Sequence, residues 1–199
     1  MDWIPFIEEK QSRYGRGQVM QGNVAYAAGL GLLMAGEDGR PWLRRAAARW
    51  RESWEFAAPN AWGRPIGVLK ALLLAGDDVD EAAHWTLELG AATAESPIGG
   101  YAGALALLSL SRREEAAHVA QSLRAREDFP HDVADALFAI AAVDVDGFTD
   151  AVQSVVRSFE TREEYLEDAA VADTALVLDL LARRNGIDVP LPASPVLPQ

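Results

Sequence analysis

Two histidines, each three residues after a glutamate, form the pattern in this sequence that could do metal chemistry. Glu81 precedes His84, and Glu115 precedes His118. Residues three apart on a helix share a face, so each pair could present a carboxylate and an imidazole to one ion. Two Glu-x-x-His pairs on separate helices make half of the ligand set of a di-iron carboxylate site in a helix bundle. One hypothesis is therefore a metal-binding helical protein that uses these four residues.

The setting of the two pairs favours a structural role instead. Both belong to a repeated segment, Glu-Ala-Ala-His at 81–84 and again at 115–118, and each stands where a helix is expected to begin. An acidic residue at a helix N-terminus is stabilised by the helix dipole. A weaker third copy at 150–153 ends in Gln153, where the other copies have histidine. We therefore interpret the pairs as helix starts and predict neither a metal nor another cofactor.

No other catalytic pattern is present in the sequence. It contains three histidines and no cysteine, which excludes a cysteine nucleophile and a thiolate metal site. It lacks a phosphate-binding Gly-x-x-x-x-Gly-Lys-Ser/Thr loop, a Gly-x-Ser-x-Gly nucleophile elbow, a His-Glu-x-x-His pair and a strand-associated dinucleotide fingerprint. We predict that the protein is not an enzyme.

Residues 40–64 are rich in tryptophan and arginine. Both residue types are enriched at the binding hot spots of protein interfaces, and Trp50 and Trp54 are one helical turn apart. The alternative is that the aromatic face anchors the N-terminal helices, with the arginines in solvent. We predict a partner-binding surface made of Trp42, Arg45, Arg49, Trp50, Trp54 and Trp62.

The elements that position these residues are expected to be helices. Ala and Leu recur at helical spacing almost throughout, and no stretch alternates apolar and polar residues long enough for a strand. Proline in a first turn and glycine after a last turn mark several boundaries, Gly76 and Gly186 among the stops. About ten helices are expected, over residues 5–14, 19–35, 41–57, 65–75, 80–94, 101–110, 111–126 with Ser111 as cap, 130–142, 146–159 and 163–185.

An internal repeat organises the middle of the chain. Leu73-Leu74, which precedes the first Glu-Ala-Ala-His, recurs as Leu107-Leu108 before the second, so both segments share a period of 34 residues. This is the length of a tetratricopeptide helix pair, and residues 65–160 resemble such repeats. The expected fold is all-α, a right-handed stack of antiparallel helix pairs (a tetratricopeptide-like α-solenoid). We expect a single domain over residues 1–199, with N-terminal helices at 1–64, helix pairs at 65–160, and a C-terminal helix with a Pro-rich tail at 161–199.

Charge is distributed unevenly along the chain, whose net charge is −12. Residues 1–64 contain nine Lys or Arg against seven Asp or Glu, a balance of +2, and residues 65–199 contain nine against twenty-three, a balance of −14. An acidic surface repels nucleic-acid phosphates and attracts basic partners. We therefore predict a protein partner and no nucleic acid, the other explanation of the charge being solubility alone.

Two further features concern location and the end of the chain. No uncharged apolar run approaches about 18 residues, the N-terminus lacks a signal-peptide pattern, and cysteine is absent, so we predict a cytoplasmic protein without a membrane partner. The prolines from Pro190 to Pro198 exclude a helix and favour an extended strip. It could be a ligand for a proline-recognising domain, but we expect its Leu and Val residues to fold back over the last helices.

Part of the sequence also resembles a known family. The resemblance is carried by Tyr165-Leu166-Glu167-Asp168, Val171 to Leu178, Ser194 to Pro198, the Trp-rich helix and the turn from Leu74 to Asp78. Together these are similar to the forty-ninth family of bacterial polymorphic-toxin immunity proteins, over residues 40–198. The resemblance implies an all-helical antitoxin that binds and blocks a cognate toxin. Many such toxins are basic nucleases, which agrees with the acidic charge.

Two other functions stay open beside this one. A general tetratricopeptide-like adaptor would hold a peptide or protein in the groove of its repeats, and a small-molecule- or metal-binding helical protein would use His84 and His118. A groove filled by the chain's own segments would argue against the adaptor.

Overall fold

A computed structural model describes residues 4–198, and this range contains nine α-helices, three short 3-10 helices and no strand. The all-α prediction is confirmed there. No helix in the range combines the length and apolarity that a bilayer crossing needs. The α-helices are α1 (Ile4–Met34), α2 (Arg40–Ser53), α3 (Gly63–Ala75), α4 (Asp80–Glu88), α5 (Pro97–Ser109), α6 (Arg113–Arg124), α7 (His131–Ala142), α8 (Val145–Glu160) and α9 (Asp173–Arg184). The 3-10 helices are η1 (Trp54–Phe56), η2 (Ala91–Thr93) and η3 (Leu166–Asp168).

The expected number of helices falls from ten to nine because the first two are one. Residues 5–14 and 19–35 both belong to α1, which runs through Gly15 and Gly17 without a break. A glycine lowers helix stability by about 1 kcal/mol but does not end a helix that packing holds. Gly15 also gives room to a neighbour, since a Cβ at this position would lie 2.4 Å from the Cβ of Phe56.

The helix expected over residues 163–185 begins only at Asp173. Residues 161–172 form an irregular segment that includes η3, where Glu167 and Asp168 have positive φ angles of 49° and 59°. This segment is rich in carboxylates that a helix would place three or four residues apart, where like charges repel. The backbone N–H of Ala172 instead donates to the carbonyl of Val196, 2.8 Å away.

Five helices end in the same backbone device, a Schellman motif. A residue with positive φ follows the helix, and its N–H and the next N–H donate to carbonyls of the last turn. The predicted stops at Gly76 and Gly186 are confirmed. Ser111 was expected to cap the next helix, but it occupies this position after α5. The five residues are Gly36, Gly76, Ser111, Val143 and Gly186.

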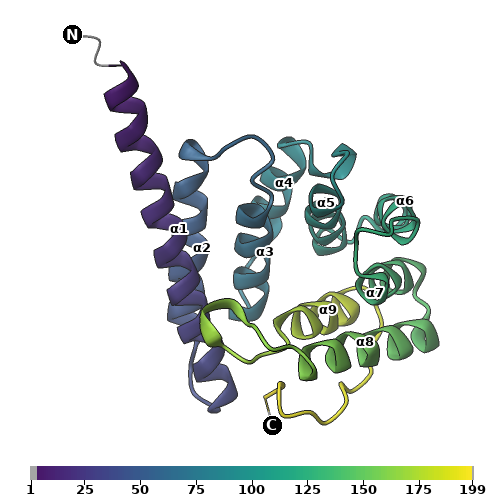
Figure 1. Cartoon of the computed structure of the whole chain (residues 1–199). Coiled ribbons are helices and arrows are strands. Elements are labelled where there is room, and N and C mark those ends of the chain that lie inside the picture. Colours follow the sequence, from purple (N-terminus) through teal and green to yellow (C-terminus); the bar gives the residue numbers. More distant parts are fainter. Residues whose placement is uncertain (1–3, 199) are drawn as a thin grey trace.

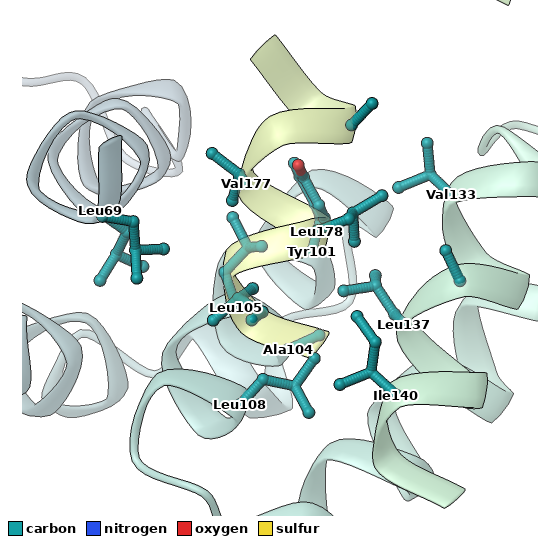
Figure 2. Packing of buried hydrophobic residues seen from close by; sticks show 14 of the residues in the cluster. Leu69, Tyr101, Ala104, Leu105, Leu108, Val133, Leu137, Ile140, Val177 and Leu178 are labelled. Atoms are coloured by element: carbon teal, nitrogen blue, oxygen red, sulfur yellow. The ribbon is translucent and has the colours of Figure 1, made fainter. Parts of the chain in front are cut away.

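Consecutive helices pack against one another along the whole series from α1 to α9, as short connections require. α9 departs from this order, because it also packs against α3, α5 and α7 (Figure 1). Figure 2 shows Val177 and Leu178 of α9 between Leu69 of α3 on one side and Leu137 of α7 on the other. The face that α3, α5 and α7 share is therefore filled by the chain's own C-terminal helix.

The C-terminal tail folds back onto the last helices, as predicted. Val196 and Leu197 are buried, and the backbone carbonyl of Val196 accepts the hydrogen bond from Ala172. The hydroxyl of Ser194 donates to the Glu160 carboxylate of α8, 2.6 Å away. The tail thus returns to the end of α8 and the start of α9, and its Val196 and Leu197 join the hydrophobic core.

Candidate functional site

A cleft of about 640 Å³ opens among α1, α2, α3, η3 and α9. Its size and mainly apolar walls are those of a ligand site with a few polar groups. We call it the aromatic cleft. Its apolar walls are formed mainly by Tyr26, Trp50, Trp62, Ile66, Ile98 and Leu166. Its polar lining residues are Asn23, Asn60, Arg64, Lys70, Ser96 and Asp173.

Trp50 forms one wall of the aromatic cleft because two glycines leave room for its ring. A Cβ on Gly22 of α1 would lie 2.6 Å from the indole nitrogen, and a Cβ on Gly67 of α3 would lie 2.5 Å from a ring carbon. The indole N–H donates to the side-chain oxygen of Asn23, 3.1 Å away. Trp50 is only 5% exposed, so it holds α2 between α1 and α3.

A polar cluster at one side of the cleft joins α1, α3 and α9. The Lys70 ammonium donates to the Asp173 carboxylate at 2.9 Å and to the Thr174 hydroxyl at 2.8 Å. The hydroxyl of Tyr26 donates to the same oxygen of Asp173, also at 2.9 Å. The side chains of Lys70 and Asp173 are only 12% and 17% exposed. Buried charges of this kind are tolerated when they are paired and hydrogen-bonded.

The electrostatics of the cluster fix its protonation states. Burial, the largest single influence, lowers the pKa of Lys70, but the surrounding charges, chiefly that of Asp173, and the hydrogen bond to Asp173 together outweigh it, so the pKa is raised. Burial, the largest single influence, raises the pKa of Asp173, but the Lys70 charge and the hydrogen bonds from Lys70, Tyr26 and the Thr174 backbone together outweigh it, so the pKa is lowered. Burial and the Asp173 charge together raise the pKa of Tyr26. At neutral pH Lys70 is therefore a cation, and a protonated amine is neither a nucleophile nor a base.

The structure does not bring the six predicted Trp and Arg residues onto one surface. Trp50 and Trp62 are 5% and 6% exposed and line the aromatic cleft. Trp54 lies in η1, not on α2, and its ring packs edge-on against Trp85, with 5.7 Å between centroids. These three rings chiefly join helices, which agrees with the alternative interpretation that the aromatic face anchors the N-terminal helices.

The other three members of that set lie toward solvent. Trp42 is 40% exposed, and the Arg45 guanidinium lies over its ring, 5.6 Å from the centroid. Arg49 is bound by neighbours, donating to Gln18 and to the carboxylate of Glu52. Trp42 and Arg45 thus form a small exposed pair, separate from the cleft, and their role in partner binding stays a prediction.

The four residues of the metal hypothesis are engaged separately. His84 donates through Nδ1 to the carbonyl of Asp80 at 2.8 Å, and His118 does the same to the carbonyl of Glu114 at 2.7 Å. Glu115 is held by both sides of the Arg112 guanidinium. Glu81 and His84 are on α4 and the other pair is on α6, and α5 packs against both helices. Within residues 4–198, no three His, Asp or Glu side chains are grouped so that they could hold a metal ion.

A second concavity, of about 510 Å³, lies between α7 and α8. The Arg124 guanidinium donates to Asp135 at 2.6 Å. Among the described residues, the other three aspartates of this concavity have no ion-pair partner. We call it the acidic groove, and its four aspartates are Asp132, Asp135, Asp144 and Asp150.

Neither the polar cluster around Lys70 nor the acidic groove was predicted from the sequence. One signal for the first was available, because Lys70 is one of only two lysines and the only charged residue between Pro65 and Gly76. A charge in an apolar helix needs a buried partner. Nothing local pointed to Asp173 as that partner, since it lies 103 residues further along the chain.

Comparisons with known proteins leave the family of the chain open. No family model matches the sequence, and neither a curated protein nor a solved structure gives a significant match. The resemblance to an immunity-protein family therefore stays a prediction.

Proposed function

We propose that this chain is a non-catalytic protein-binding module, an immunity protein that binds and neutralises a cognate toxin domain with a basic surface. The observation that carries the proposal is the acidic groove between α7 and α8. Three of its four carboxylates form no ion pair with any of the described residues. Unpaired surface charges of one sign speed the association with an oppositely charged partner and select against others.

The position of α9 supports a partner that binds to the outer surface of the protein. The finer fold that we propose is a tetratricopeptide-like, right-handed stack of helix pairs, which the packing of consecutive helices supports. A peptide adaptor of this kind would offer the face shared by α3, α5 and α7, but α9 occupies that face. Of the two protein-binding functions, this observation favours the immunity protein over the adaptor.

The test begins with the gene beside that of this chain, which we expect to encode a toxin domain, and asks whether this chain rescues cells from that toxin. Co-expression of the wild-type protein should restore growth, and the two purified proteins should form a complex. Asp132→Asn together with Asp150→Asn removes two charges from the groove and should slow association at least about tenfold at low salt. The control pair, Glu37→Gln with Glu55→Gln, removes two exposed charges elsewhere on the chain. A wild-type protein that neither rescues growth nor binds the toxin would refute the proposal, and equal losses in both pairs would exclude the groove as the contact.

A further inference from the structure

We propose that the aromatic cleft binds a small anionic molecule, a carboxylate carried on an aromatic or other flat apolar body. The inference goes beyond the proposed function and does not depend on it. Its basis is the combination of cleft size, apolar wall and one cation without an anion.

The size and the walls of the cleft indicate the size and the apolar character of the ligand. A cavity of about 640 Å³ falls within the range of roughly 300–1,000 Å³ that small-molecule sites occupy. The indole rings of Trp50 and Trp62 line the cleft, together with the aliphatic side chains of Ile66, Ile98 and Leu166. A flat apolar group would replace water against these side chains, which is favourable in proportion to the apolar area covered.

The charge of the lining sets the sign of the ligand. Its charged residues are Arg64, Lys70 and Asp173. Lys70 and Asp173 form an ion pair, which leaves one positive charge, that of Arg64, in a chain whose net charge is −12. The site thus differs in sign from the protein as a whole, and an anion would find its complement here.

Arg64 is a cation that has a hydrogen-bond acceptor but no anion as a partner. Its guanidinium donates to the backbone carbonyl of Ser53, and no carboxylate among the described residues pairs with it. Partial burial lowers the pKa of Arg64, because water is removed and no anion compensates. A guanidinium offers several N–H groups in one plane, which suits the two oxygens of a carboxylate.

A second donor at the cleft supports the same ligand. The side-chain oxygen of Asn23 accepts the indole N–H of Trp50, and this bond orients the amide. The NH₂ group of Asn23 has no acceptor among the described residues, and Asn23 lines the cleft. It can therefore donate to an oxygen of the ligand.

The probe for this site is 2-naphthoate, and its neutral isostere 2-naphthamide is the control ligand. Binding is followed through the indole N–H signals in ¹H–¹⁵N NMR spectra, assigned with single Trp→Phe variants. We expect saturable shifts of the Trp50 and Trp62 signals and none of the Trp42 signal, which lies outside the cleft. Naphthoate should bind at least about tenfold more tightly than naphthamide, because a hydrogen-bonded charge pair is added.

Variants of the cation separate charge recognition from a general apolar effect. Arg64→Gln should weaken the binding of naphthoate about tenfold and leave the affinity for naphthamide unchanged. Unchanged binding of naphthamide also shows that the cleft is intact. Arg64→Lys should keep most of the preference for the anion, and Arg45→Gln, which removes an exposed cation near Trp42, should change neither ligand. Absent shifts of Trp50 and Trp62 at millimolar naphthoate would overturn the proposal. Equal affinities for the two ligands, or an unchanged naphthoate affinity in Arg64→Gln, would overturn the assignment of an anion.

Discussion

The ammonium of Lys70 lies 2.9 Å from the carboxylate of Asp173, although 103 residues separate them in the chain. The contact joins α3 to the first residue of α9. Because α9 fills the face that α3, α5 and α7 share, this pair, with the Tyr26 hydroxyl, fixes where the C-terminal helix starts.

Breaking this pair from one side should be costly. Asp173→Ala leaves the buried Lys70 ammonium without its counter-charge, so we expect the free energy of unfolding to fall by about 3–5 kcal/mol. The double variant Lys70→Met with Asp173→Leu removes both charges and should lose clearly less. Urea unfolding of the two variants measures the difference. Equal stability of Asp173→Ala and the wild type would show that the pair does not hold α9.

The same pair predicts a pH dependence. The pKa of Asp173 is lowered from its ordinary value of 3.8, so its contribution to stability is present above that pH and is lost as the pH falls through the folded-state value. The stability difference between the wild type and Asp173→Asn should therefore be constant from neutral pH to about pH 5 and shrink below pH 4. Urea midpoints at a series of pH values test this, and a difference that grows toward acid pH would contradict the assigned charge states.

Gly22 and Gly67 should resist substitution because of Trp50. An alanine Cβ at either position would come within 2.6 Å of the Trp50 ring, so we expect each Gly→Ala change to lower the stability by about 1–3 kcal/mol. Gly17→Ala is the matched control on α1, where a Cβ meets nothing within 4 Å. It should raise the stability by about 0.5–1 kcal/mol, because alanine favours the helix. Thermal unfolding distinguishes them, and a stabilised Gly67→Ala would disprove the close contact.

Val143 occupies a helix-ending position that suits glycine. Its φ angle is 56°, and a left-handed backbone costs an L-residue about 1–2 kcal/mol, more when the side chain is branched at Cβ. Val143 is 36% exposed, so the apolar burial that its side chain loses on substitution offsets part of the gain from relieving this cost. We expect Val143→Gly to stabilise the protein by up to about 1 kcal/mol, after the greater freedom of the unfolded glycine is subtracted.

The reverse change provides the check on that prediction. Gly76 ends α3 in the same motif with a φ angle of 69°, and Gly76→Ala should destabilise the protein by about 1 kcal/mol. Differential scanning calorimetry of both variants shows whether their changes in stability have opposite signs. A loss of stability in Val143→Gly would mean that the valine side chain contributes more by packing than its backbone costs.

What the sequence determined by itself is local. Helical spacing of Ala and Leu, with proline at helix starts and glycine at helix ends, predicted an all-α protein and most helix boundaries, because helix hydrogen bonds join residues four apart. The 34-residue repeat likewise has a local cause in part, since His84 and His118 each bond the backbone carbonyl four residues earlier. The helix predicted over residues 163–185 is present from Asp173 to Arg184, but the prediction was wrong over residues 163–172, where a distant segment, the tail at Val196, takes the N–H of Ala172.

What only the tertiary structure decided is which distant residues meet. Residues 40–64 are rich in tryptophan, but whether each ring faces a partner or a neighbouring helix depended on the packing, as for Trp50, whose ring fits against Gly22 of α1 and Gly67 of α3. Lys70 is a charged residue in an apolar helix, but only the packing of α9 against α3 identifies Asp173 as its partner. The aromatic cleft has lining residues from position 19 to position 173. Such a site leaves no periodic trace in the sequence, because its members are brought together by the packing of helices and not by their spacing along the chain.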